Sequence, residues 1–266
     1  MGFIRKWLLS VFCIFLFLFL LAGNIFLIIT LSLDYEYLKS EMVSMTSSLA
    51  EGNSSFSNEI EDAQYQKIIS YCLNNSEFVF EDEKIKGNSF TIPCEIAKKG
   101  KDAVFEKAAE EFFYKIYYNN YSCNFFNCFK EEKSLFFLVS EKSKNFWKNS
   151  LFFSIVISLV LILAVFLIVE NRENFLIITG VLIIFSSLSI VGIDRLVFTL
   201  SNIFSFFEAL GITNEIVFKI ISIFFSKSGS VFIAGFSIGA FLVILGIVFL
   251  ASKRFYKQTP PGTIQE

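Results

Sequence analysis

Four apolar runs and one long polar stretch divide this chain of 266 residues. The first run extends from Trp7 to Leu33, and three others cover Leu151–Val169, Phe175–Ile193 and Val231–Ala251. Leu8–Leu33 and the three later runs contain no Asp, Glu, Lys, Arg or His. An apolar stretch of about 18 residues or more can cross a bilayer as a helix. The pattern therefore predicts an α-helical integral membrane protein with four transmembrane helices.

The first apolar run fits either a permanent anchor or a cleaved signal peptide. Arg5 and Lys6 precede it, but a signal peptide has an apolar core of only about 7–15 residues. Cleavage after Gly23 would put Leu21 where a small residue is needed. We expect residues 1–33 to form a cytoplasmic tip followed by an uncleaved signal anchor, with cleavage as the alternative.

The polar stretch predicts a small α+β domain over residues 34–148. Glu77–Phe80 and Ser89–Ile92 are typical of two short strands around a turn. An amphipathic helix is expected over about 102–118, and Lys107 and Glu111 make an oppositely charged pair on its polar side. The apolar face of that helix is predicted to comprise Phe105, Ala109, Phe112 and Ile116.

Four of the five cysteines lie in this domain, namely Cys72, Cys94, Cys123 and Cys128. Disulfides persist in oxidising compartments, so this grouping favours an extracytoplasmic domain. Four cysteines allow three pairings. We favour Cys72–Cys94, which ties a helix end to the strand hairpin, and Cys123–Cys128, which closes a small loop.

Three other roles for these cysteines stay open. Membrane oxidoreductases that pass electrons to quinone also have four helices and outward-facing cysteines. Their reactive pairs are typically two residues apart, whereas Cys123 and Cys128 have four residues between them. A zinc site of four cysteines has poor spacing here, and free thiols are the remaining alternative. We expect no metal and no cofactor.

The rest of the chain predicts a helical hairpin, a connecting region and a last span. Residues 149–193 form the hairpin of the second and third spans, because only a five-residue polar turn separates them. Residues 194–230 predict two short extracytoplasmic helices at the membrane interface, with a re-entrant segment as the alternative. Residues 231–251 form the fourth span, and residues 252–266 a disordered cytoplasmic tail.

The distribution of basic residues favours cytoplasmic termini, because cytoplasmic loops are enriched in Lys and Arg. Four crossings put Arg5, Lys6, Arg172, Lys253, Arg254 and Lys257 on one side. The short loop on the other side carries Arg195, Lys219 and Lys227. We therefore expect a multi-pass protein of the cell membrane with both termini cytoplasmic and residues 34–148 extracytoplasmic.

Small and polar residues in the spans predict close helix packing. Gly235, Gly239 and Gly246 fall on one face of the fourth span, which permits another helix to approach closely. Packing within the bundle is the favoured interpretation, and a seam between two copies is the alternative. Asn24 is the one amide in the four spans and predicts a hydrogen bond between helices.

Composition excludes several functions. The chain has no histidine, which removes the usual general base near neutral pH and every Ser-His-Asp or Cys-His pair. A net charge of −2 argues against nucleic-acid binding. Carboxylate runs such as Glu110-Glu111 have lysine neighbours and indicate solvated faces. We identify no catalytic residue and expect the protein not to be an enzyme.

Four short segments carry a resemblance, namely Ile92-Pro-Cys-Glu95, Tyr117-Tyr118, the Cys123–Cys128 segment and Leu138-Val-Ser-Glu141. Together they resemble a group of uncharacterised multi-pass membrane proteins of small-genome archaea. The resemblance covers about residues 92–251 and implies the membrane architecture and a Cys-containing extracytoplasmic domain. It implies no activity.

These observations predict a non-enzymatic membrane protein whose extracytoplasmic domain mediates binding or assembly at the cell surface. Its expected partners are membrane lipid and another membrane or surface protein, or a second copy of itself. The alternatives are a thiol–disulfide membrane oxidoreductase and an accessory subunit of a larger membrane complex.

Overall fold

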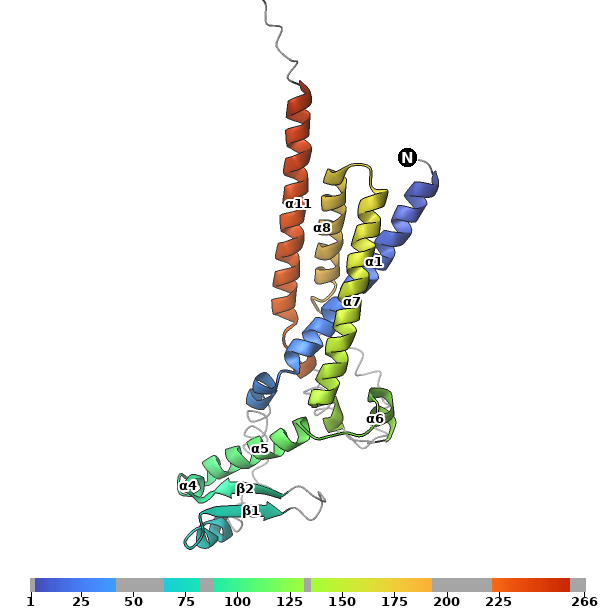
Figure 1. Ribbon diagram of the computed structural model, residues 1–266. Helices are drawn as coiled ribbons and strands as arrows, with labels where there is room; N and C mark the ends of the chain where they lie inside the picture. The colour runs from blue at the N-terminus through green and yellow to red at the C-terminus, as the bar shows by residue number, and fades with distance from the viewer. Residues whose placement is uncertain (1–2, 42–64, 82–88, 132–134, 193–221, 259–266) are drawn as a thin grey trace, which may run out of the picture. The chain divides into compact units, whose positions relative to one another are not determined.

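The computed structural model describes residues 3–41, 65–81, 89–131, 135–192 and 222–258 (Figure 1). The chain divides into two compact units. Met1–Ser32 and Phe146–Glu266 make up the first, here called the helical unit, and Leu33–Asn145 make up the second, here called the hydrophilic unit.

Long apolar helices dominate the helical unit. They are α1 (Phe3–Ser32), α7 (Glu141–Ile168, with residues from Phe146 on in this unit), α8 (Arg172–Leu188) and α11 (Ser228–Gln258). Three stretches are long and apolar enough to cross a membrane, namely Phe3–Ser32, Glu141–Ile168 and Ser222–Lys253. At about 1.5 Å per residue such helices exceed the roughly 30 Å of a hydrocarbon core. Membrane-spanning length is thus confirmed for three of the four predicted spans.

The third predicted span is shorter in the structure than in the sequence pattern. Helix α8 has 17 residues and ends at Leu188, not at Ile193. The hydroxyls of Ser186, Ser187 and Ser189 donate to backbone carbonyls three or four residues earlier, and such bonds compete with regular helix geometry. Gly192 then adopts a φ of 95°, which is incompatible with helix. The apolar run continues past the helix as a turn.

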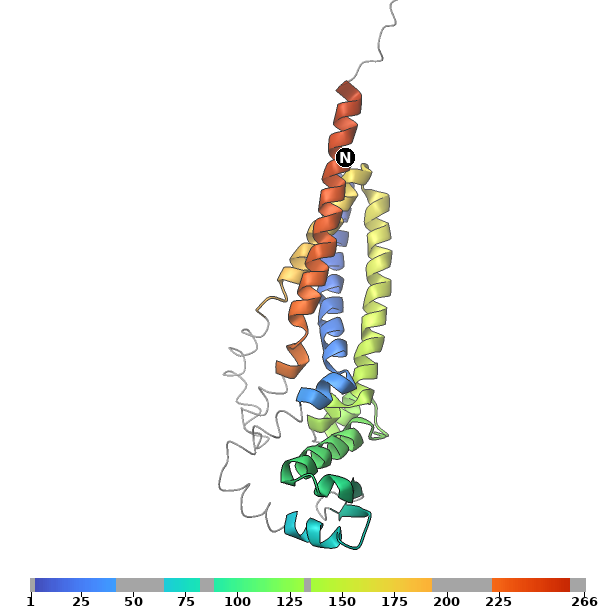
Figure 2. The ribbon, with the colours of Figure 1, turned by 90° about the vertical axis from the view of Figure 1, so that its left-hand side faces the viewer.

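Helices α8 and α11 run antiparallel and side by side (Figure 1). At one end, Glu173 of α8 pairs with Lys253 of α11 at 3.0 Å. At the other end, Ile190 and Val231 share a buried cluster with Ile28 of α1. Figure 2 shows the axes of α1 and α7 roughly aligned with those of this pair. Helix α8 therefore returns the chain along most of the length of α11.

The hydrophilic unit combines short helices with a two-stranded sheet. Strands β1 (Glu77–Glu81) and β2 (Ser89–Pro93) pair antiparallel, with Phe78 opposite Ile92. Residues 65–71 are helical and precede β1. Four more elements follow β2, namely α4 (Cys94–Ala97), α5 (Lys101–Tyr117), α6 (Phe125–Glu131) and the 3₁₀ helix η1 (Leu135–Val139). Mixed α and β structure is as expected.

Helix α5 lies beside the sheet (Figure 1) and buries different faces along its length. Val104, near its start, packs in the cluster around Cys72 and Cys94. Phe113, near its end, is also buried, yet it lies nine positions on, about 180° around the helix from Val104. The predicted single apolar face is therefore wrong in part. Ile116 is buried, but Phe112 is only half-buried, because the two halves of the helix pack against different groups.

Two further predictions concern the C-terminal tail and the region between the third and fourth spans. Helix α11 continues to Gln258, so the first part of the tail predicted to be disordered is helical. The ion pair of Lys253 stabilises this extension, and the next helix-breaking residue is Pro260. The short helices predicted in residues 194–230 lie largely outside the described residues, since the description resumes at residue 222.

Candidate functional site

Cys72 and Cys94 lie at disulfide distance inside a buried apolar cluster of the hydrophilic unit. Their Cα atoms are 5.3 Å apart, within the usual range for a bridge. Both cysteines are buried together with Ile68, Ile92 and Ala97. Cys72 follows the helix at residues 65–71 and Cys94 follows β2, so the bridge joins the helix end to the strand pair. The side chains around it are apolar, which is the setting of a structural bridge.

Cys123 and Cys128 form the second pair, with Cα atoms 5.2 Å apart. Cys128 belongs to α6 and is buried, while Cys123 is half-buried. The ring of Phe137 from η1 closes this small core, 5.2 Å from Tyr121 and 5.4 Å from Phe125 between centroids. The two pairs are those that the sequence analysis favours.

An aromatic cluster surrounds Tyr35, three residues beyond the end of α1. The rings of Phe113, Tyr114, Tyr117 and Tyr118 lie with centroids between 5.2 and 6.0 Å from the Tyr35 ring. Tyr117 is buried and donates a hydrogen bond of 2.9 Å from its hydroxyl to the carbonyl of Leu33. Burial raises the pKa of Tyr117. The sequence-based prediction did not include this cluster, although the repeated Tyr and Phe residues between positions 113 and 118 indicate aromatic packing.

The polar side of α5 carries a small network of ion pairs. Lys39 pairs with Glu110, and Lys107 pairs with Glu110 at 3.1 Å and with Glu111 at 2.9 Å. The hydrogen bond from Lys39, assisted by Lys107, holds the pKa of Glu110 below its usual range. At the start of the unit, the hydrogen bond from Lys144 likewise lowers the pKa of Asp34, at 2.9 Å. These carboxylates are ionised partners of lysines.

No group of three or more metal-ligating side chains occurs within the described ranges. What the hydrophilic unit does present is exposed apolar surface. Leu73 is 78% exposed directly after Cys72, and Phe126 is 68% exposed between the second pair of cysteines.

The predicted glycine stripe packs against α8 within the same chain. A Cβ atom added at Gly239 would lie 2.7 Å from Ile184 Cγ1, and one at Gly246 would lie 2.6 Å from Ile177 Cγ1. Gly235 lies against the hydroxyl of Ser187. Such distances are too short for a real side chain, so the stripe allows the two backbones to approach closely.

Polar side chains join α1 to its neighbours. The amide of Asn24 donates to Ser186 Oγ on α8 at 3.3 Å, so the predicted interhelical hydrogen bond of Asn24 is present. Ser154 of α7 donates to the carbonyl of Phe19 at 2.8 Å. Gly23 lies against Ser154, since an added Cβ would be 3.1 Å from its hydroxyl oxygen. Hydroxyls and amides at such positions hold helices together in an apolar surrounding.

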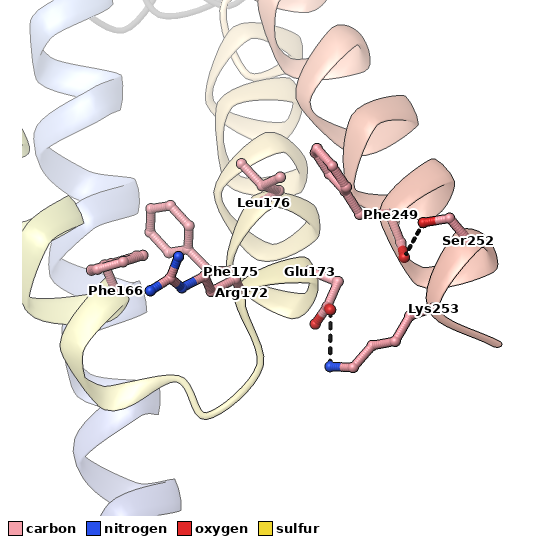
Figure 3. Close-up of a pocket in the computed structure, with 8 residues that line it drawn as sticks. All are labelled: Phe166, Arg172, Glu173, Phe175, Leu176, Phe249, Ser252 and Lys253. Atoms are coloured by element: carbon pink, nitrogen blue, oxygen red, sulfur yellow. Dashed lines mark hydrogen bonds and ion pairs between the residues drawn. The ribbon is translucent and has the colours of Figure 1, made fainter. Parts of the chain in front are cut away.

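A pocket of about 730 Å³ opens near the turn between α7 and α8 and beside the end of α11. Figure 3 shows the residues that line it: Phe166, Arg172, Glu173, Phe175, Leu176, Phe249, Ser252 and Lys253. Its walls are apolar and its charged residues come from the starts and ends of helices. In the sequence, Arg172 and Lys253 indicate only the membrane topology, because the pocket depends on contacts between segments that spacing along the chain does not reveal.

No protein-family model, no curated protein and no solved structure matches this chain. The resemblance to multi-pass membrane proteins of small-genome archaea accordingly stays a prediction. Any functional conclusion rests on the geometry of the two units.

Proposed function

We propose that this chain is a four-span membrane protein that holds residues 34–148 outside the cytoplasm, where they bind another membrane or surface protein. The observation that carries the proposal is a separately packed hydrophilic unit that has two cysteine pairs at disulfide distance and exposes large apolar side chains. The role is binding, without catalysis.

Four crossings are supported by the course of α8. Its 17 residues reach about 25 Å, and bilayer thinning or flanking residues accommodate a helix slightly shorter than the hydrocarbon core. Helix α8 runs antiparallel to α11 from the Glu173–Lys253 pair to the Ile190–Val231 cluster. This parallel course supports counting α8 as the fourth crossing.

The orientation is supported by charge and by redox chemistry. Arg5 bonds to the carbonyl of Ile168 at 2.7 Å and to Glu170 at 2.8 Å, and Lys253 pairs with Glu173. The start of α1, the α7–α8 turn and the end of α11 therefore share one end of the helical unit. That end is the basic one, which favours the cytoplasm. Disulfides in residues 34–148 are stable in an oxidising exterior.

Protein binding is supported by the surface next to the Cys72–Cys94 bridge. Large apolar residues near that bridge are exposed to 47% at Tyr71 and 78% at Leu73. Tyr71 is held by an edge-to-face contact with Phe78, whose ring centroid is 5.5 Å away. Exposed apolar residues on a rigid backbone lose little conformational entropy on binding, which favours a protein contact.

The test is photo-crosslinking in intact membranes. A photoreactive residue at Leu73 is expected to give a discrete crosslinked product. The variant Leu73→Asp is expected to abolish binding of the partner protein while the chain remains folded. The matched control carries the same photoreactive residue at Lys98, which is exposed but polar. Equal crosslinking at the two positions, or none at Leu73, would contradict the proposed binding surface.

A further inference from the structure

The pocket in the helical unit combines apolar walls with a charged edge. Phe166 of α7 and Phe175 of α8 form one wall, with ring centroids 5.2 Å apart in an edge-to-face contact. Leu176 and Phe249 supply more of the apolar lining. The volume of about 730 Å³ is in the range of pockets that bind small molecules, roughly 300–1,000 Å³. These apolar walls suit the hydrocarbon part of a ligand.

The charged edge has one positive charge in excess. Lys253 is paired with Glu173 at 3.0 Å, so these two charges offset each other. Arg172 is exposed and has no hydrogen-bond or ion-pair partner in the part of the chain that the structure describes. Figure 3 shows its guanidinium turned towards Phe166 and Phe175, away from the Glu173–Lys253 pair. A guanidinium in this setting suits a phosphate, which it can bind through two parallel hydrogen bonds.

One buried polar atom at the same edge lacks a hydrogen-bond partner. Glu173 Oε2 is buried and accepts no hydrogen bond among the described residues. An acceptor of this kind fits the hydroxyl of a head group.

In the membrane topology proposed above, the pocket falls at the depth of the lipid phosphates. Its charged residues follow the end of α7 at Ile168 and fall near the end of the spanning stretch Ser222–Lys253. Basic pockets between membrane helices on the cytoplasmic side are suited to anionic lipid head groups. We propose that this pocket binds one anionic phospholipid, with its phosphate at Arg172 and its acyl chain against Phe166, Phe175 and Phe249. The proposal rests on the membrane location proposed above.

The experiment uses the full chain purified in a non-ionic detergent. It is titrated with phosphatidylglycerol, with phosphatidylcholine of the same acyl chains and with inorganic phosphate, and bound lipid is counted by native mass spectrometry. We expect one phosphatidylglycerol per chain, bound about tenfold more tightly than phosphatidylcholine, because the choline cation offsets the phosphate charge of phosphatidylcholine whereas phosphatidylglycerol keeps a net negative charge beside Arg172. Inorganic phosphate alone is expected not to bind measurably.

Two variants separate the head group from the acyl chain. Arg172→Gln is expected to abolish the preference for phosphatidylglycerol, whereas Lys148→Gln, which removes a positive charge from an exposed position near the other end of α7, retains it. Leu176→Trp, which keeps every charge but fills the pocket, is expected to weaken the binding of both lipids. Melting curves without added lipid show that each variant is folded.

Equal binding of the two lipids, an unchanged preference in Arg172→Gln, or binding of phosphate as tight as that of phosphatidylglycerol would overturn the lipid site. A failure of the membrane location itself has a different signature, because alkaline carbonate would then release the chain from cell membranes. The two results are read separately.

Discussion

Gly239 of α11 lies directly against Gly180 of α8, so closely that a Cβ atom added at Gly239 would be 2.8 Å from the carbonyl oxygen of Gly180. The added atom would also lie 2.7 Å from Ile184 Cγ1. Neither neighbour can move without shifting helix backbone or a packed side chain. This contact determines how close the two antiparallel helices come.

Gly239→Leu is therefore expected to disrupt the pairing of α8 with α11. Overpacking a tight contact costs about 1–3 kcal/mol, and a leucine against backbone belongs at the upper end of that range. Thermal unfolding in detergent measures the loss. Gly229→Leu is the matched control in α11, since no atom lies within 4 Å of a Cβ added there. Equal stability of the two variants would show that the glycine stripe is not a packing surface.

The Asn24–Ser186 hydrogen bond links α1 to α8 and is testable by a double-mutant cycle. We expect a coupling energy of about 0.6 kcal/mol, and at most about 1.7, as is typical of hydrogen bonds between membrane helices. The cycle is needed because the Ser186 hydroxyl also donates to the carbonyl of Ile183 at 2.9 Å. Pairing Asn24→Ala with Ser189→Ala, at an exposed serine of the same region, serves as the uncoupled control. Equal coupling in the two cycles would contradict the bond.

Much of the helical unit follows from the sequence, because apolar length and glycine spacing are local properties. The end of α8 could not be predicted in this way. Ser186, Ser187 and Ser189 lie within an apolar run of the sequence, and only the structure shows that their hydroxyls bond to the backbone. The length of a helix depends on such competition between side-chain and backbone hydrogen bonds, which hydropathy does not measure.

The surfaces and pockets depend on contacts between distant segments, and these were the harder part to predict. Val104 and Phe113 are both buried on nearly opposite sides of α5, because one end of the helix packs on the cysteine core and the other beside Tyr35. A periodicity argument assumes one buried face. The pocket at Arg172 likewise needs α11 to end beside α8, which spacing along the chain cannot show.

The proposed topology predicts which lysines react from outside intact cells. Lys98 and Lys99 are exposed in the hydrophilic unit, whereas Lys253 is at the opposite end of the proposed path through the membrane. A membrane-impermeant amine reagent is expected to modify Lys98 and Lys99 but not Lys253 or Lys257, with the sites mapped by mass spectrometry. Lysed cells provide the control, in which both groups react. Labelling of the tail alone in intact cells would invert the orientation.

Acid is expected to weaken the hydrophilic unit through Glu110. Its pKa is lower in the folded protein, because Lys39 and Lys107 bond to the ionised form. The unfolded chain then binds more protons in this range, so stability rises with pH. The contribution is complete above the unfolded pKa of about 4.3 and is lost as the pH falls through the lower, folded value. Asp34, whose pKa is also lowered, adds a loss in the same direction.

The variant Glu110→Gln tests this assignment by unfolding measurements between neutral and acidic pH. It is expected to be less stable than the unmodified chain at neutral pH and to lose less stability on acidification. Glu106→Gln removes the same charge from an exposed position of α5 and should keep the full acid-dependent loss. If Glu110→Gln is as acid-sensitive as the unmodified chain, the ion network contributes nothing to folding.

The two cysteine pairs are expected to stabilise the hydrophilic unit unequally. A bridge restricts the unfolded chain more when it closes a longer loop. The separations of 22 residues for Cys72–Cys94 and 5 for Cys123–Cys128 correspond to about 3.4 and about 2.1 kcal/mol. Replacing both cysteines of a pair by alanine, and measuring unfolding of the full chain, gives each value. Equal losses, or a larger one for the shorter loop, would contradict the structural ranking.

The same cysteines also separate the binding role from the alternative of thiol–disulfide exchange. A catalytic pair must be reachable and must cycle between states, whereas a structural pair stays oxidised. Cys72, Cys94 and Cys128 are buried, and only Cys123 is half-buried. We therefore expect both pairs to be fully oxidised when thiols are blocked in cells before lysis and the sites are mapped by mass. Cys13, the free cysteine, is the internal control for complete blocking. A substantial reduced fraction of Cys123–Cys128, or a mixed disulfide to another protein, would favour the oxidoreductase instead, because a pair that only stabilises the fold has no reason to leave the oxidised state.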